Sequence, residues 1–268
     1  MTETALATLP EAQTPAAKLL QTKIASVIAT CPDHSDAARQ RFAHICMAIS
    51  NTKEIAACDP VSVVMTMYGC AKLGLVPDKN LGHVYIIPRY ENRVQQATLM
   101  VGYRGYMELA RRSGHVSYID ARVVYKNDLF DPQYGTTPGI IHKPWFALGK
   151  GKAGEPWAAY CVAKLSGQDV YQFDILTLSD INAAKKASKN SSKEYSPWIQ
   201  YPMEMWRKTA VRRASKYWPL STELANAVAW DEQAEMGRRQ EIPIPDFDGP
   251  PIEAKTDPLM QEIENDGE

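Results

Sequence analysis

Hydrophobic residues recur at helical spacing in the first part of the chain. Between residues 35 and 57, a phenylalanine and three isoleucines stand near the period of an α-helix, which predicts an amphipathic helix. The pair Asp59-Pro60 favours the start of a second helix, because aspartate caps a helix and proline fits its first turn. This second helix is predicted to run to about Leu73 and to end at Gly74.

The middle of the chain is rich in β-branched and aromatic residues. Residues 83–90 and 97–103 flank a polar turn and predict a hairpin. The further predicted elements here are a helix at 104–113, a strand at 116–126 and a second hairpin at 157–165 and 170–176. We interpret residues 127–154, which are rich in glycine and proline, as loop.

Helical patterns return in the last third of the chain. Ser179 is the expected N-cap of a helix that runs to about Ala187, and the polar residues 188–196 are expected to form a mobile loop. Two more helices are predicted, one from Tyr201 or Pro202 to a point before Pro219, and one from Thr222 to about Arg239. Strands in the middle with helices on either side indicate the α+β class, with a small antiparallel sheet of two hairpins plus a strand.

Composition divides the 268 residues into three predicted regions. Residues 1–18 are rich in Ala, Thr and Pro and are expected to form a disordered arm, while residues 19–240 are the predicted folded domain. Residues 241–268 are rich in proline and acids and are expected to be a disordered tail. The chain has no run of 18 apolar residues, no signal-peptide pattern and no C-x-x-C pair, so we expect a cytoplasmic protein with reduced cysteines.

The net charge of −1 hides a strong asymmetry along the chain. Residues 101–218 hold 18 basic and 10 acidic residues, whereas residues 219–268 hold 3 and 13. The basic segment indicates a polyanionic partner. The acidic tail is interpreted as a partner-binding arm or a mobile mimic of DNA, with a purely solubilising tail as the alternative.

The helix predicted between residues 203 and 218 carries the most informative pattern. Its cations fall on one side at helical spacing: Lys208, Arg212 and Lys216, with Arg213 at the edge. Cations with no acid among them repel one another, so this side is expected to be an exposed face that binds phosphates, although a merely soluble surface stays open. Arg207 lies on the apolar side and is expected either to snorkel or to pair with an acid there, as a structural rather than a DNA-facing residue.

The stretch VGYRGYMELARRSG, residues 101–114, places Arg104 at a strand-to-helix corner. Gly102 and Gly105 on either side of it would let the backbone approach another chain, either DNA or a neighbouring subunit. Arg104 is expected to meet a phosphate there, with help from the helix N-terminus. The pair at 111–112 is interpreted as capping the end of the same helix.

The expected DNA-contacting residues come from four parts of the chain. They are Tyr103 and Arg104 at the corner, Lys185 and Lys189 beside the mobile loop, Lys208, Arg212, Arg213 and Lys216 on the cationic helix, and Arg122 and His83 in the strand region. Aromatic rings near such cations suit sequence-tolerant base stacking.

Sequence signatures of catalysis are absent. There is no G-x-x-x-x-G-K-[ST] motif and no zinc-type spacing of His and Cys, so the chain is not expected to be an ATPase or a hydrolase, or to hold a metal. No cofactor is required by this interpretation, and Mg²⁺ is expected at most to modulate DNA binding. The alternatives are a metal-dependent nuclease that uses Asp128 and Asp131, and a scaffold that binds nucleic acid passively.

Four motifs, taken in order, resemble the RecT family of phage-type single-strand annealing proteins. They are LGLVPDKNLGHVYIIP (73–88), VGYRGYMELARRSG (101–114), ARVVYKNDLFD (121–131) and WRKTAVRRASKYWP (206–219). The resemblance runs from roughly residue 20 to residue 232. The N-terminal arm and the acidic tail lie outside it.

The resemblance implies a recombinase that anneals complementary strands without ATP. It further implies binding of single-stranded DNA, assembly into rings or helical filaments, a partner exonuclease and contact with the host single-strand-binding protein. The core is expected to be of the Red beta and Rad type, a small antiparallel sheet with a long helix.

Overall fold

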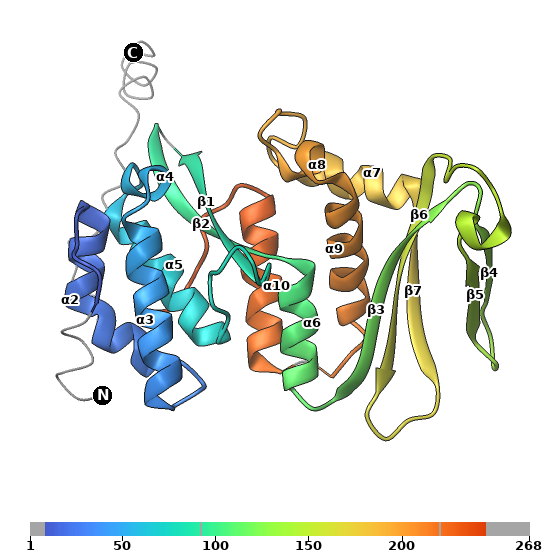
Figure 1. The fold of residues 1–268 in the computed structure, drawn as a ribbon, viewed down its shortest axis with the longest axis horizontal. Coiled ribbons are helices and arrows are strands. Elements are labelled where there is room, and N and C mark those ends of the chain that lie inside the picture. The colour runs from blue at the N-terminus through green and yellow to red at the C-terminus, as the bar shows by residue number, and fades with distance from the viewer. Residues whose placement is uncertain (1–8, 92, 220, 245–268) are drawn as a thin grey trace, which may run out of the picture. The chain divides into compact units, whose positions relative to one another are not determined.

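The computed structural model describes residues 9–91, 93–219 and 221–244 of the protein (Figure 1). These residues divide into two units. The first contains the described residues of 9–71, 86–98 and 242–244, and the second contains residues 72–85 and 99–241. Residues 1–8 of the predicted arm at 1–18, and most of the predicted acidic tail, lie outside the described residues. None of the described helices is long and apolar enough to cross a bilayer.

Helices make up most of the first unit. They are α2 (Pro15–Ala29), α3 (Asp36–Ser50), α4 (Lys53–Ala56) and α5 (Pro60–Leu73). The helices predicted from the isoleucine pattern and from Asp59-Pro60 are confirmed, and the Asp59 carboxylate accepts a hydrogen bond from the Ser62 amide at 2.8 Å. The helix at 15–29 was not predicted. Its first residues were assigned to the disordered arm, yet Thr14 caps it and Leu20 and Ile24 bury its apolar stripe.

The second unit contains the larger sheet and the helices packed on it. The strands are β1 (Val84–Glu91) and β2 (Val94–Val101), which belong partly to each unit, then β3 (Val116–Tyr125), β4 (Leu129–Gln133), β5 (Gly139–Lys143), β6 (Pro156–Leu165) and β7 (Tyr171–Thr177). The helices are α6 (Tyr103–Arg112), the 3-10 turn η1 (Trp145–Leu148), α7 (Leu178–Ala187), α8 (Pro197–Gln200), α9 (Pro202–Ser215) and α10 (Thr222–Glu235).

The α+β class is confirmed, but the described strands form three sheets rather than one. β1 pairs with β2, β4 pairs with β5, and β3, β6 and β7 form an antiparallel sheet in the order β3-β6-β7. Both predicted hairpins exist. The N-cap of α7 is Thr177, which forms a capping box with Asp180, so the prediction of Ser179 was wrong.

The hairpin of β4 and β5 occupies a region that was interpreted as loop. Phe130 and Ile140 on its inner face pack against Tyr160, which lies with Val124 and Ala158 in a buried cluster on the larger sheet. These strands were missed because they are short and are interrupted by glycine and proline.

The opposite face of the larger sheet is covered by α9 (Figure 1). Along β6 three buried residues of this face are small, namely Ala159, Cys161 and Ala163. Small side chains allow a helix to approach the sheet closely, and the other side of α9 packs against α6. Helix α9 is therefore packed on two sides. Trp198 in α8 is buried.

Gly102 and Gly105 do make a close backbone approach, but the approach is to the chain itself. The Gly102 amide donates a hydrogen bond of 2.9 Å to the carbonyl oxygen of His83. A Cβ on Gly102 would overlap with the carbonyl oxygen of Gly82, and a Cβ on Gly105 would overlap with that of His83. The interpretation that these glycines admit DNA or a neighbouring subunit was wrong, because the segment before β1 occupies the space.

We expect Gly105→Ala to destabilise the protein. Glycine to alanine within a helix normally stabilises by about 1 kcal/mol, but overlap with the His83 backbone reverses the sign. The free energy of unfolding from urea titration should fall by about 1–3 kcal/mol. Gly151→Ala, whose Cβ would enter open space, is the matched control and should change stability by less than about 0.5 kcal/mol. Equal stability of the two variants would contradict this account.

Candidate nucleic-acid interface

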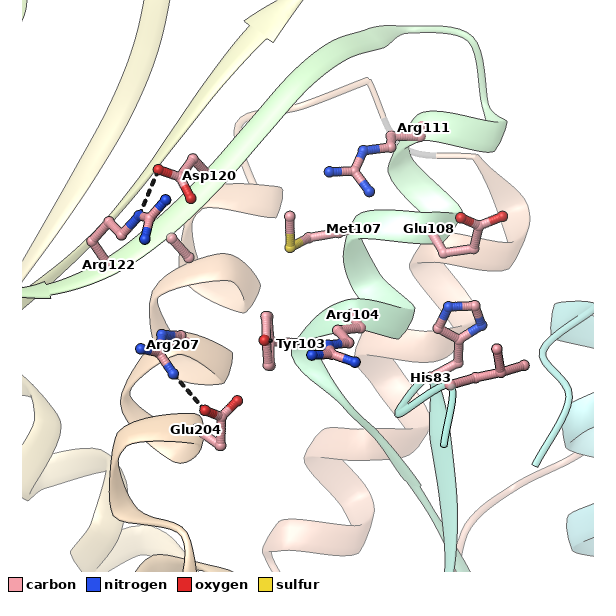
Figure 2. Close-up of a pocket in the computed structure, with 12 residues that line it drawn as sticks. His83, Tyr103, Arg104, Met107, Glu108, Arg111, Asp120, Arg122, Glu204 and Arg207 are labelled. Carbon is pink, nitrogen blue, oxygen red and sulfur yellow. Dashed lines mark hydrogen bonds and ion pairs between the residues drawn. The ribbon is translucent and has the colours of Figure 1, made fainter. Parts of the chain in front are cut away.

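A pocket of about 680 Å³ lies within the second unit, between α6, the edge strand β3, the first half of α9 and the segment before β1. Its lining residues are Leu81, His83, Tyr103, Arg104, Met107, Glu108, Arg111, Asp120, Ala121, Arg122, Glu204 and Arg207 (Figure 2). Four of them are residues that the sequence predicted as DNA contacts: His83, Tyr103, Arg104 and Arg122. The fold thus brings together predictions from three separate motifs.

Helix α6 supplies one wall of the pocket. Arg104 and Arg111 are seven residues apart, so they lie on the same face of the helix, two turns from each other. Both are exposed, and neither forms an ion pair with any acid among the described residues. The Arg104 guanidinium lies 5.9 Å from the centroid of the Tyr103 ring and donates to the Tyr103 hydroxyl at 3.3 Å, and this hydrogen bond raises the Arg104 pKa.

The opposite wall carries arginines that are already paired. On β3, Arg122 Nε lies 2.8 Å from Asp120 Oδ2, and on α9, Arg207 pairs with Glu204 (Figure 2). Of the two expectations for Arg207, the structure shows pairing with an acid, but Arg207 also lines the pocket, which the sequence interpretation did not expect. The two walls therefore differ: α6 offers unpaired cations, and β3 with α9 offers cations whose charge is balanced.

His83 lies on the pocket side of the segment before β1, beside Glu108 (Figure 2). Partial burial lowers the pKa of His83, and the nearby charges of Arg104 and Arg112 act in the same direction, while Glu108 opposes them. The imidazole is therefore neutral at pH 7. Such a side chain can contact a base or a sugar, but it adds little positive charge to the pocket.

The expected cationic face of α9 does not form, because Lys208 is buried, Arg212 is largely buried, and both are paired with acids. Lys208 Nζ lies 2.8 Å from Asp231 and 3.1 Å from Glu235, and its side chain is 4% exposed. Arg212 lies 2.6 Å from Glu235 and 3.4 Å from Asp231. The prediction that these residues form an exposed DNA-binding face was wrong. The acids that balance them stand on α10, so they could not be seen on α9 itself.

The remaining cations of that helix are also paired. Arg213 bridges Asp174 on β7 at 2.9 Å and Asp180 on α7 at 3.0 Å, which ties three elements together. Lys216 is 60% exposed and lies 3.3 Å from Glu232. Neither residue lines the pocket.

Two further expected contacts lie elsewhere in the second unit. Lys185 is half-buried in the last turn of α7, and Lys189 is exposed just after that helix. Neither lines the pocket, and neither forms an ion pair with a described acid. Their role in DNA binding stays a prediction.

Arg111 and Arg112 were interpreted together as caps of their own helix, and the structure separates them. Arg111 lines the pocket. Arg112 instead donates to the carbonyl oxygens of Leu73 and Gly74, at 3.0 Å for Gly74, where helix α5 ends. The sequence could not show which of the two arginines faces the pocket. Arg112 repeats at four residues with Arg104 and Glu108, and Arg111 is only one position earlier.

The alternative of a nuclease site is not favoured by the placement of its two aspartates. Asp128 closes a turn: its carboxylate accepts from the amides of Tyr125 and Trp145, each at 2.7 Å, and lies 3.1 Å from His142. Asp131 is exposed on β4. Within the described ranges, no three His, Cys, Asp or Glu side chains are grouped closely enough to hold a metal ion.

Comparison with known proteins places the chain in a family. The family model described as RecT family matches residues 40–245. The chain is 34% identical over 213 residues to protein RecT of Escherichia coli (strain K12), covering 76% of this chain and 75% of that protein. It is also 33% identical over 92 residues to the uncharacterized protein YqaK of Bacillus subtilis (strain 168), covering 34% of this chain and 31% of that protein.

The protein belongs to the class of DNA recombination proteins that bind single strands and anneal them. Within that class, the chain is a member of the RecT family.

We expect Lys208→Met to destabilise the protein strongly, because it removes one partner from a buried ion-pair network. Loss of one member of such a network typically costs about 3–5 kcal/mol in the free energy of unfolding. The control is Lys216→Met at the C-terminal end of α9, whose exposed pair with Glu232 should contribute less than about 1 kcal/mol. Chemical denaturation of both variants measures the difference, and a stable Lys208→Met protein with weakened DNA binding would restore the exposed-face interpretation.

Proposed function

We propose that the protein anneals complementary DNA strands without ATP and holds the phosphate backbone of one strand against the α6 wall of the pocket. The observation that carries this proposal is the pair Arg104 and Arg111, two exposed arginines on one helix face with no described acid as an ion-pair partner. Phosphate contacts position a strand but do not read its sequence, which is what annealing of arbitrary strands requires.

The spacing of the two arginines fits a strand with stacked bases. Seven residues of helix rise about 10.5 Å. A strand in B-form geometry rises about 3.4 Å per nucleotide, so Arg104 and Arg111 would meet phosphates about three nucleotides apart. Tyr103, next to Arg104, would then lie beside a base or sugar of the same strand.

Annealing needs no chemical energy source. Base stacking contributes about 1.4 kcal/mol per step, so ten steps release roughly 14 kcal/mol. The barriers are repulsion between the two backbones and self-structure within each strand. A protein that neutralises one backbone and leaves the base edges accessible lowers both barriers.

Assembly and partners also belong to this proposal. Family membership supports oligomers along the DNA, a partner exonuclease and contact with the host single-strand-binding protein. The exposed Lys189 and the half-buried Lys185 would have an auxiliary role in DNA binding. Any Mg²⁺ would act on DNA binding rather than in a chemical step.

The double variant Arg104→Ala/Arg111→Ala is expected to lose annealing and to bind single strands less tightly. Each phosphate contact contributes about 0.7 to the slope of log affinity against log salt on single strands, so the magnitude of the slope should fall by about 1.4. The activity is measured as energy transfer between the labels of two complementary oligonucleotides when they anneal without ATP.

Arg41→Ala, which changes an exposed arginine on α3, is the matched control. An unchanged salt slope in the double variant would show that the α6 wall is not part of the DNA site. If the unaltered protein accelerated annealing no more than a generic polycation does, the passive scaffold would be favoured.

Removal of the acids on the opposite wall should have the reverse effect. Glu204→Gln frees Arg207, so single-strand affinity is expected to rise several-fold and the salt slope to steepen by about 0.7. Glu232→Gln, which frees Lys216 outside the pocket, changes the net charge equally and should leave the slope nearly unchanged. Equal effects of the two variants would indicate a general charge effect rather than a local one.

A further inference from the structure

An exposed row of aromatic and cationic side chains crosses one end of the larger sheet. Tyr118 on β3 pairs with Lys164 on β6, which pairs with Tyr171 on β7. Directly opposed residues of antiparallel strands project to the same face, so the three side chains form one row. We call Tyr118, Lys164 and Tyr171 the tyrosine row.

The contacts within the tyrosine row show that it is organised. The rings of Tyr118 and Tyr171 meet edge to face with centroids 6.0 Å apart, and Lys164 Nζ lies 5.7 Å from the centroid of Tyr171. The tyrosines nevertheless remain 47% and 45% exposed. The hairpin of β4 and β5 covers the other end of this sheet face, around Tyr160, and leaves the tyrosine row open.

The tyrosine row is continuous with the pocket through β3. Alternation along the strand places Tyr118, Asp120 and Arg122 on the same face of the sheet. Asp120 and Arg122 also line the pocket. A strand that leaves the α6 wall and crosses the edge strand at Arg122 would therefore pass the Arg122–Asp120 ion pair and then reach Tyr118.

The chemistry of the tyrosine row suits bases rather than phosphates. Arg122 is paired with Asp120, and Lys164 lies 3.4 Å from Asp169, so the charges nearly balance. The Lys164–Asp169 pair is weak, because Asp169 is fully exposed, and the lysine can turn toward a phosphate. Tyrosine faces accept any base by stacking and leave its pairing edge free.

We infer that the tyrosine row is a second contact site of this protein, which stacks bases of the single strand whose backbone lies in the pocket. The inference rests on the proposed function and extends it. The pocket would hold phosphates, and the sheet face would hold bases, with β3 as the border between the two sites. Neither site reads sequence.

The test uses the double variant Tyr118→Leu/Tyr171→Leu, which keeps apolar bulk but removes the aromatic faces. Stacking of one base on one ring is typically worth about a factor of ten, so affinity for an oligothymidylate should fall by about tenfold to a hundredfold. Affinity for an abasic oligonucleotide of equal length, which has the same phosphates, should match that of the unaltered protein. Tyr118→Phe/Tyr171→Phe should restore oligothymidylate binding.

The controls separate this inference from the proposed function. Arg104→Ala/Arg111→Ala should weaken both oligonucleotides, whereas the leucine variant should weaken only the one with bases. Tyr217→Leu, which changes an exposed tyrosine outside the tyrosine row, should weaken neither. Photo-crosslinking of 5-iodouracil oligonucleotides should label Tyr118 or Tyr171.

Three results would overturn the inference. The first is equal loss of abasic and oligothymidylate binding in the leucine variant, which would indicate a structural or charge effect. The second is unchanged binding of both oligonucleotides by that variant. The third is a change in assembly size by light scattering without DNA, which would assign the tyrosine row to contact between copies of the chain. In each case the arginine double variant still reports on the proposed function independently.

Discussion

The second unit depends on one buried carboxylate, Asp231 on α10. It accepts from Lys208 at 2.8 Å, from the Tyr106 hydroxyl at 2.9 Å and from the Val101 amide at 3.1 Å, with Arg212 at 3.4 Å. These partners come from α9, α6 and β2. A buried carboxylate is tolerated only when its hydrogen bonds are satisfied and its charge is balanced, and here both conditions hold. The arrangement therefore fixes where three elements meet.

The same interaction holds the proposed DNA-binding helix in place. Tyr106 lies on α6 between Arg104 and Arg111, and burial together with the charge of Asp231 raises its pKa, so the hydroxyl stays a donor. Burial alone would raise the pKa of Glu235, but Lys208 and Arg212 lower it, and that carboxylate remains charged. The buried face of α6 is thus held by ionic and hydrogen-bonded partners, while the opposite face carries the two arginines of the pocket.

The sequence allowed both long hairpins and most of the longer helices, but not α2, to be predicted, because each rests on a local pattern. Four residues predicted as DNA contacts line one pocket. It did not show which sides of α9 are buried and which side is exposed. A helix that packs on two sides buries part of its polar stripe, and periodicity within one helix cannot show this. A usable signal did exist: Lys208 and Arg212 repeat at four residues, and so do Asp231 and Glu235 on α10. Matching opposite charges at equal spacing on two helices indicates an interhelical network.

Close backbone approaches were the other limit on sequence reasoning. The glycines at 102 and 105 correctly indicated that some chain comes near, but the partner was residues 82–83, which are close only in the folded protein. Likewise, no pattern within β4 or β5 could show that this hairpin covers one end of the larger sheet and leaves the other end open. Non-local contacts of this kind decide which surfaces remain for a ligand.

The two walls of the pocket and the open end of the sheet suggest how annealing avoids trapping its own product. A groove cationic on every side would hold a second backbone as firmly as the first, and duplex would accumulate on the protein. Here Asp120 and Glu204 balance the arginines that face α6. In the proposed arrangement one backbone is therefore attracted and a second one is not, so the incoming strand is retained only through base pairing. Selection by pairing rather than by charge is the property that separates an annealing protein from a polycation.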